Sequence, residues 1–440
     1  MAVPLTLLQV GEGRFLRAFL GPLLADLRAR GAFSGEAILT APRPTGSATL
    51  SLLVTRRGHY RVTVRGPEGA VVEDLAPYDR IVDGSIAPQT LADAATGPAA
   101  LVIVSNTTEA GLEYRGPQPY GAATTYPARL AQLLAERDRR GGTAPVAVLP
   151  CELVQGNGGR VRQAVRQHLE DWGFDAAPLE RAAFCDTLVD RIVTSEDPLD
   201  PLACFTEPFA AWYIAGAPDW LRAALPFNPR WVHWVDDLTL PHARKVRLLN
   251  GTHTLMAVLG LLLGVETVSA ALADPRLGTF LRNAMFVEGV GSFAAADRPA
   301  ARAFGEETVA RLVNPGIRDP LARLTLQLSA KVRARWEPIF EGFRAEHGRW
   351  PRRFALGLAA YLRLVLAAAP VDVAGVEEPS WARGLRQVAE GLPPPEFVRR
   401  AAAMEGWPGP RDPGLLALVA EAMEGDLTAL IRAADAETPV

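Results

Sequence analysis

The sequence contains little cysteine, almost no lysine and no long apolar run. Its three cysteines, Cys151, Cys185 and Cys204, show neither a Cys-x-x-Cys pair nor a Cys/His spacing. This argues against a disulfide scaffold and a thiolate zinc site, and it fits a reducing, cytoplasmic location. The apolar run 254–265 is shorter than the roughly 20 residues that cross a bilayer. We therefore expect no membrane segment, and we find no signal-peptide pattern at the start of the chain.

Only two of the 46 basic residues are lysines, Lys245 and Lys331. A genome biased toward arginine explains the low number but not why these two positions keep lysine. Arginine cannot be deprotonated in a protein, whereas a buried lysine can lose its proton. The two lysines therefore indicate proton transfer or a compact hydrogen-bond donor, with chance retention as the alternative.

The remaining composition describes a globular protein with nearly balanced charge. A net charge of −3 and a pI near 6.1 argue against nucleic acid and anionic membrane surfaces as partners. With 49% hydrophobic residues over 440 positions, the chain has enough core for two domains. We expect a small-molecule substrate and a monomer or weak homo-oligomer.

The first half of the chain alternates short apolar runs with amphipathic stretches, which indicates parallel strands connected by helices. Strands are expected at 5–10, 37–41, 60–65, 101–105, 146–150, 182–189 and 210–214, and helices at 14–30, 126–139 and 157–172.

The second half shows helical periodicity from residue 236 onward, and we expect no strand there. Helices are expected at 244–263, 268–272, 276–287, 306–313, 320–336, 352–369, 380–391, 394–404 and 414–433. The Pro-containing segment 225–229 is the expected connector. The predicted fold is α/β, with a Rossmann-type parallel-sheet N-terminal domain (1–227) that binds a dinucleotide. A mostly α-helical C-terminal domain (228–440) follows and carries substrate-binding and catalytic residues.

A glycine turn between the first strand and the first helix suggests a dinucleotide site. Gly11 permits a tight turn, Gly13 lets the backbone approach a pyrophosphate, and Arg14 and Phe15 open the helix whose free N–H groups would face the phosphate. Leu16 stands where the third glycine of the full fingerprint would be. An ordinary turn is the alternative.

Polar residues follow the strand expected at 101–105, namely Asn106, Thr107, Thr108 and Glu109. Ligands of open α/β sheets bind at the carboxyl ends of the strands, so these residues suit a nicotinamide ribose and carboxamide. A helix N-cap cluster would have the same composition. The segment after the second strand has no acidic residue for a ribose, and Arg43 stands where a 2′-phosphate would lie. The residues alone leave NAD and NADP open.

Lys245, Asn250 and His253 form the strongest constellation. At about 100° per residue on an α-helix, Asn250 lies roughly 140° and His253 roughly 80° from Lys245, so one face can present all three. Their neighbours are apolar, and buried polar groups need partners. The trio suits interconversion of a carbonyl and an alcohol, with Lys245 as general acid/base and Asn250 and His253 as donors to the substrate oxygen. The sequence shows no histidine spacing typical of a zinc site, so no metal is expected.

Arg323 and Lys331 lie eight residues apart on the helix expected at 320–336. At that spacing the two side chains are about 80° apart and can face one pocket. They would suit an anionic substrate or its hydroxyls. A solvated helix face is the alternative.

Segments from residue 8 to about 335 together resemble one enzyme family. They are GEGRFLRAF (11–19), SNTTEAG (105–111), YPA (126–128), PCEL (150–153), NG (157–158), TLVDRIV (187–193), EPF (207–209), VDDL (235–238), the Lys245/Asn250/His253 signature, NP (314–315) and Lys331. The chain resembles the polyol-specific long-chain dehydrogenase/reductase family, which includes the mannitol dehydrogenases. The resemblance implies a zinc-independent reaction with NAD, in which Lys245 is the acid/base and Asn250 and His253 polarise the substrate oxygen. It also places Asp190 near the substrate.

Within this family the chain is most similar to the tagaturonate reductase (altronate dehydrogenase) branch. Mannitol dehydrogenases carry an Asp-Asn pair where this chain has Glu152 and Leu153. The resemblance therefore implies a sugar-acid substrate and reduction of tagaturonate to altronate with NADH. A fructuronate reductase or a mannitol-type polyol 2-dehydrogenase is the alternative within the family, and a 3-hydroxyacid dehydrogenase of the 6-phosphogluconate type is the alternative outside it. The resemblance fades after about residue 340.

Overall fold

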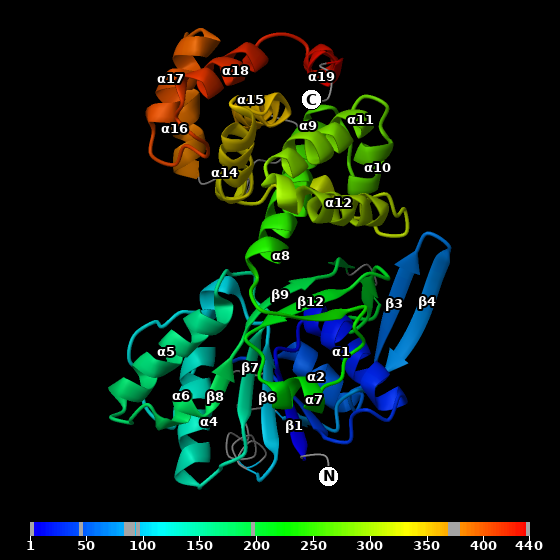
Figure 1. The fold of residues 1–440 in the computed structure, drawn as a ribbon, viewed down its shortest axis with the longest axis vertical. Helices are drawn as coiled ribbons and strands as arrows, with labels where there is room; N and C mark the ends of the chain where they lie inside the picture. The colour runs from blue at the N-terminus through cyan, green and yellow to red at the C-terminus, as the bar shows by residue number, and fades with distance from the viewer. Residues whose placement is uncertain are drawn as a thin grey trace. The chain divides into compact units, whose positions relative to one another are not determined.

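The computed structural model describes residues 4–43, 47–82, 93, 97–194, 199–367 and 379–436. The chain divides into two compact units, Met1–His242 and Ala243–Val440 (Figure 1). Each unit has a hydrophobic cluster of its own.

A six-stranded parallel sheet forms the centre of the first unit. Its strands are β1 (Leu5–Val10), β2 (Glu36–Thr40), β5 (Arg80–Val82), β6 (Ala100–Ser105), β7 (Val146–Pro150) and β8 (Ala182–Phe184). The order is β5-β2-β1-β6-β7-β8, and all five pairings are parallel. This is the strand order of the Rossmann fold, with its reversal between β1 and β6. The α/β fold expected for the first half is confirmed.

Helices cover both faces of this sheet. They are α1 (Arg14–Ala29), α2 (Ala48–Thr55), η1 (a 3-10 turn, Glu109–Leu112), α4 (Tyr126–Arg139), α5 (Asn157–Asp171), α6 (Ala177–Glu180) and α7 (Asp219–Ala224). Leu5 and Leu7 of β1 belong to the cluster that includes α1, whereas Leu8 and Val10 belong to the cluster with α4 and α5. Successive side chains of a strand point to opposite faces, so both faces are buried. This is why β6 is a nearly continuous apolar run and β1 is mostly apolar.

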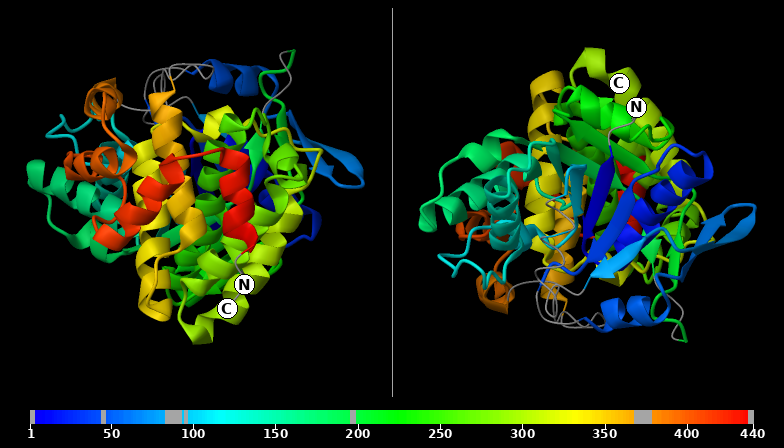
Figure 2. Two further views of the ribbon diagram at one scale, coloured as in Figure 1. Left: turned by 90° about the horizontal axis from the view of Figure 1, so that it is seen from above. Right: turned by 90° about the horizontal axis from the view of Figure 1, so that it is seen from below.

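Two smaller sheets complete the first unit. One has the order β10-β11-β3-β4 and the other β13-β12-β9. Their strands are β3 (Tyr60–Gly66), β4 (Gly69–Leu75), β9 (Asp186–Asp190), β10 (Val193–Thr194), β11 (Cys204–Thr206), β12 (Ala211–Ala215) and β13 (Val232–Val235). The β3–β4 hairpin projects from the unit in both views of Figure 2.

The single strand expected over 182–189 is wrong. The chain divides at Cys185 into β8 and β9, which belong to different sheets. The start of α5 lies against this point, since a Cβ on Gly158 would come within 2.6 Å of the Cys185 backbone. The Asp186 carboxylate accepts hydrogen bonds from the N–H groups of Gly158 (2.8 Å) and Gly159 (3.2 Å). Asp186 thus caps α5 where the chain changes sheets, a contact that apolar periodicity does not encode.

Helices make up the chain from residue 239 onward. They are α8 (Thr239–Arg244), the π turn η2 (Lys245–Asn250), α9 (Gly251–Leu262), α10 (Val268–Ala273), α11 (Gly278–Asn283), the π turn η3 (Ala284–Gly289), the 3-10 turn η4 (Ala295–Asp297), α12 (Arg298–Leu312), α13 (Leu321–Leu324), α14 (Leu328–His347), α15 (Arg352–Leu366), α16 (Pro379–Ala389), α17 (Pro394–Ala403), α18 (Pro413–Met423) and α19 (Leu427–Ala436). Among the described residues of this region, the only β pairing is the isolated bridge Thr267–Pro320. The expected helical second half is confirmed.

Several of the expected helices differ in detail. The helix expected over 320–336 is divided into α13 and α14, because Gln327 adopts a left-handed conformation with φ 51°. The helix expected over 414–433 is divided into α18 and α19, with Gly425 at φ 86° between them. The helix expected at 244–263 begins at Thr239 and contains η2. Local propensity does not reveal these breaks, since tertiary packing decides them.

Candidate functional site

The glycine turn after β1 lies where three strands of the parallel sheet end. Gly11 has φ 127°, a conformation that favours glycine, and its N–H donates to Thr40 O at 2.9 Å. A Cβ on Gly11 would lie 2.8 Å from Asn106 O, just after β6. Gly11 is therefore required by the close approach of β1, β2 and the segment after β6.

Gly13 has a different role from Gly11. It is the N-cap of the 16-residue helix α1, which has no side-chain cap and no acidic residue in its first turn. A Cβ on Gly13 would meet no described protein atom within 4 Å, so packing against those atoms does not explain the glycine. A helix start with free N–H groups is a site for phosphate. The exposed Arg14 adds positive charge there, whereas Phe15 stacks on Phe19 with ring centroids 5.0 Å apart.

Two buried polar residues that the sequence analysis missed hold the carbonyls of this turn. Gln9, fully buried in β1, donates to Gly11 O (2.7 Å) and accepts from the Tyr78 hydroxyl (2.8 Å). Arg17, also buried, donates to Glu12 O. A glutamine inside the apolar strand LTLLQV was the available signal.

These two contacts orient the turn. The C=O and N–H of a trans peptide point in opposite directions. Because the carbonyls of Gly11 and Glu12 face buried donors, the N–H groups of Glu12 and Gly13 face away from them. The turn can therefore present two N–H groups to a pyrophosphate although Leu16 replaces the third glycine.

The loop after β6 is fixed by the buried Glu152, which is 3% exposed. The Glu152 carboxylate accepts from Thr107 N (2.8 Å), from the Thr107 hydroxyl (3.0 Å) and from the Ser105 hydroxyl (3.2 Å). Burial raises the pKa of Glu152, and the hydrogen bonds from Thr107 act in the opposite direction. Asn106 donates to Cys151 O at 2.9 Å. In the sequence Glu152 stands out only as part of the family resemblance, whereas its contacts make it the anchor of this loop.

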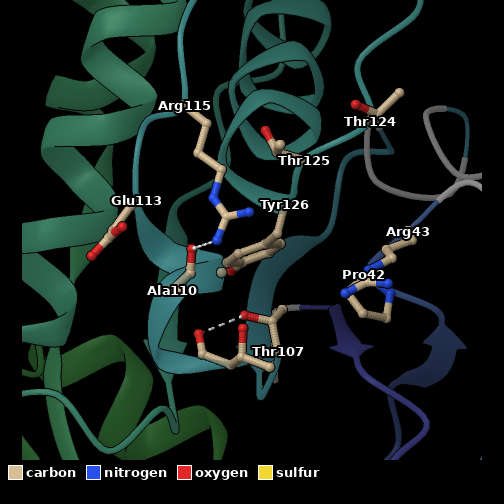
Figure 3. Close-up of a pocket in the computed structure, with 11 residues that line it drawn as sticks. Pro42, Arg43, Thr107, Ala110, Glu113, Arg115, Thr124, Thr125 and Tyr126 are labelled. Carbon is tan, nitrogen blue, oxygen red and sulfur yellow. Dashed lines mark hydrogen bonds between the residues drawn. The ribbon is translucent and has the colours of Figure 1, made fainter. Parts of the chain in front are cut away.

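A cleft follows the ends of β1, β2 and β6. One pocket of about 350 Å³ contains Thr107 and Thr108, and another of about 330 Å³ contains Gly11 and Gly13. The two pockets share Pro42, Arg43 and Thr107. Figure 3 shows the first pocket, with Arg43 on one side and Arg115, which donates to Ala110 O (3.0 Å), on the other.

Most of the predicted cofactor residues come together around this cleft. They are Gly11, Gly13, Arg14, Asn106, Thr107 and Thr108. Glu109 begins η1, and its side chain lies outside the described residues. The free helix start, the outward N–H groups and the open space at Gly13 fit a dinucleotide.

Asp190 is the last residue of β9 and is buried. The next residue, Arg191, donates to Glu207 O (3.0 Å) and to Ala18 O. Burial lowers the pKa of Arg191 to about 10. Arg191 thus anchors the Val-Asp-Arg-Ile segment and holds the end of β9 that carries Asp190.

Lys245 and Asn250 are the first and last residues of the π turn η2, so the assumed α-helical geometry is wrong here. The N–H of Gly251 donates to Val246 O, five residues back, which is the π pattern. A wider turn moves Asn250, five residues after Lys245, toward the same face as Lys245. His253 follows in α9; Lys245 and His253 are each 8% exposed. Such turns occur frequently at functional sites.

Arg323 and Lys331 do not share a helix as expected, because Arg323 lies in α13 and Lys331 in α14. The 80° relation between them is therefore wrong. Arg323 forms an ion pair with Asp319 at 2.7 Å. Lys331 donates to Leu324 O at 3.0 Å, across the break between the two helices.

Within the described part of the chain, no three His, Cys, Asp or Glu residues are grouped so that they could hold a metal ion. None of the helices described is long and apolar enough to cross a membrane.

Family models match most of the chain. The mannitol dehydrogenase Rossmann domain matches residues 5–220, and the mannitol dehydrogenase C-terminal domain matches residues 237–388. The chain belongs to the mannitol dehydrogenase family. It is an oxidoreductase of the dehydrogenase type, with a Rossmann domain in its first half.

Two bacterial relatives of this mannitol dehydrogenase family member are named altronate oxidoreductase. The Halalkalibacterium halodurans protein is 33% identical over 387 residues, which cover 82% of this chain and 75% of the relative. The Bacillus subtilis protein is 29% identical over 394 residues, which cover 82% of this chain and 79% of the relative.

Two solved structures share the fold of this family. A substrate-free D-sorbitol dehydrogenase has a TM-score of 0.80 at 21% identity, covering 98% of this chain and 95% of the other. The Pseudomonas fluorescens mannitol 2-dehydrogenase, in a ternary complex with NAD and D-mannitol, has a TM-score of 0.73 at 20% identity, covering 98% and 94%.

Proposed function

We propose that the protein is an NAD-dependent oxidoreductase that interconverts tagaturonate and altronate. The observation that carries the proposal is the similarity, over 82% of the chain, to enzymes named altronate oxidoreductase. The cleft at the ends of β1, β2 and β6 supports a dinucleotide cofactor. The buried positions of Lys245 and His253 beside Asn250 support proton transfer to a substrate oxygen.

Each residue of the trio has a distinct role in the proposed reaction. The reduced nicotinamide, when bound, supplies a hydride to the keto carbon. Lys245 donates a proton to the keto oxygen as negative charge develops on it, and it accepts that proton in the reverse direction. Asn250 and His253 donate hydrogen bonds to the same oxygen and stabilise this charge. Because Lys245 is 8% exposed, bulk water has little access to the proton-transfer group.

The residues proposed to bind the cofactor all lie in the first unit. The outward N–H groups of Glu12 and Gly13 and the side chain of Arg14 bind the pyrophosphate. The loop of Asn106, Thr107, Thr108 and Glu109 contacts the nicotinamide ribose and carboxamide. NAD is proposed from the family resemblance. Arg43, which lines the cleft, supports NADP as the alternative.

Three further residues are proposed as contacts for the sugar acid. Asp190 suits substrate hydroxyls, whereas Lys331 and Arg323 suit the carboxylate. Arg323 forms an ion pair with Asp319, and the Lys331 ammonium donates to Leu324 O, so both cations have protein partners beside the proposed carboxylate. The three cysteines are buried free thiols, which supports the proposed cytoplasmic location.

An NADH-oxidation assay over tagaturonate, fructuronate and fructose tests the proposal. We expect the highest kcat/KM with tagaturonate, and NADH formation from altronate in the reverse direction. A higher kcat/KM with fructuronate or fructose would favour the fructuronate reductase or polyol dehydrogenase alternative. No oxidation with any of these substrates, by a protein that binds NADH, would refute the proposal. The Lys245→Arg variant, which should bind NADH without catalysing the reaction, gives the background rate of NADH oxidation.

A further inference from the structure

The π turn that carries Lys245 and Asn250 is followed directly by Gly251, which makes three contacts at once. Its N–H donates to Val246 O, a hydrogen bond of the π pattern, and also to Leu248 O. Its carbonyl accepts from the Trp336 indole N–H at 2.9 Å. A Cβ on Gly251 would lie 2.9 Å from Ile339 Cδ1, so α14 packs closely against this glycine.

A second donor from α14 reaches the preceding residue. Arg335 donates to the Thr254 hydroxyl at 2.9 Å and to Asn250 O at 3.5 Å. The Thr254 hydroxyl in turn donates to Asn250 O at 3.0 Å. Two successive carbonyls, those of Asn250 and Gly251, are therefore bonded by two successive residues of α14. Trp336 is fully buried and Arg335 is half-buried, so neither contact lies in open water.

These contacts act where the helix changes from π to α register. A π turn adds one residue to the helical repeat, so its loss would rotate Lys245 relative to His253 by about 100°. In a regular α-helix Lys245 and His253 would be about 80° apart and Lys245 and Asn250 about 140° apart, so the π turn brings the three side chains into closer alignment. Without a constraint from outside the helix, the α register is the common one, since π turns are rare.

We propose that Arg335 and Trp336 are positioning residues that hold the π register of η2, and thereby keep Lys245 and Asn250 on one face for proton transfer. The proposal rests on the proposed function for its catalytic consequence. The structural part, that α14 holds the register, does not depend on which substrate is used. Neither residue needs to touch substrate.

Two variants test the proposal, each with a matched control. Trp336→Phe removes the N–H donor and keeps most of the ring volume. Its control is Trp407→Phe, because the Trp407 indole donates to Pro410 O and not to a residue of η2 or α9. Arg335→Met removes the guanidinium, and Arg333→Met is its control on the same helix, since Arg333 donates to Trp407 O.

The first measurement is amide hydrogen exchange of peptides that cover 245–255. We expect faster exchange in Trp336→Phe and Arg335→Met than in the wild type, and no change in the two controls. Unchanged exchange in both test variants would overturn the proposal. The exchange measurement needs no substrate, so it tests the role of α14 independently of the reaction. If the wild type reduces no keto-sugar, that result refutes the proposed function and leaves the exchange result valid.

The second measurement separates kcat, KM and the pH profile. Small misplacement of a reacting group can lower a rate by about 10²-fold. We expect kcat to fall at least tenfold in both test variants, with an altered pH dependence of kcat and an unchanged NADH Kd. Arg335→Lys keeps a donor and should recover part of the rate, and it remains informative if Arg335→Met does not fold. A kcat within twofold of wild type in folded Trp336→Phe, and in Arg335→Met where it folds, with the wild-type pH profile, would also overturn the proposal.

Discussion

Replacing the two glycines of the cofactor turn by alanine should give two different outcomes. Gly11→Ala places a methyl group 2.8 Å from Asn106 O at a φ of 127°. Gly13→Ala places a methyl group where no described protein atom lies within 4 Å, at a φ of −62° that alanine adopts readily. The first change should impair folding and cofactor binding together, and the second should impair cofactor binding alone.

The magnitudes follow from these geometries. A glycine-only backbone conformation costs about 1–3 kcal/mol for another residue. Relief of the clash by moving Asn106 would weaken the Asn106 N–H bond to Val10 O (3.1 Å), which is worth about 1 kcal/mol. Gly11→Ala should therefore lose about 2–4 kcal/mol, or roughly 4–16 °C in the Tm of the first unit. Gly13→Ala should stay within about 1 kcal/mol of wild type.

Cofactor binding should separate the variants further. A methyl group at Gly13 would displace the pyrophosphate from at least one charge-assisted hydrogen bond, worth about 1.5–3 kcal/mol. The NADH Kd should therefore rise roughly 10- to 150-fold.

Thermal unfolding and NADH fluorescence titration measure both effects. Gly31→Ala is the control, because Gly31 has φ 65° but a Cβ there would meet nothing within 4 Å. It should lose some stability and keep the wild-type Kd. A wild-type Kd in Gly13→Ala, or a wild-type Tm in Gly11→Ala, would refute the reasoning for that glycine.

Four further predictions concern catalysis, cofactor choice, metal and pH. Lys245→Arg should bind NADH normally and lose about 10²–10⁴-fold in kcat, since arginine cannot release a proton; a near-normal kcat would move the proton transfer to another residue, His253 first. The kcat/KM for NADH should exceed that for NADPH. A preference for NADPH that is lost in Arg43→Ala would instead make Arg43 a ligand of the 2′-phosphate. Activity should survive exhaustive treatment with EDTA, and loss that zinc restores would contradict the mechanism. Burial lowers the pKa of His168, and its two ring nitrogens are buried with no hydrogen-bond partner. The unfolded state therefore binds more protons than the folded state at acidic pH, and the free energy of unfolding should fall as the pH drops below about 6.5. Replacing it by His168→Phe should reduce the loss of unfolding free energy between pH 8 and pH 5, and an equal loss in both proteins would contradict this.

The sequence alone predicted the parallel sheet and the strands around the cofactor turn. The reason is physical: a parallel strand buried on both faces must be mostly apolar, so β1, β6 and β7 are readable as apolar runs, although β1 also contains Thr6 and Gln9. Gly11 and Gly13 were also readable, because a pair of glycines between a strand and a helix is typical of a phosphate-binding turn. Lys245 was also noticeable in the sequence, because only two of the 46 basic residues are lysines.

Contacts between distant parts of the chain decided the rest. The division of 182–189 at Cys185, the break at Gln327 and the π register at Lys245 all occur within segments whose local pattern predicts one regular element. Gln9 and Trp336 act through single hydrogen bonds to carbonyls of other residues, and such bonds leave no periodic trace. Periodicity reports which face of an element is buried, whereas the register of a turn depends on which donor the tertiary structure brings to its backbone.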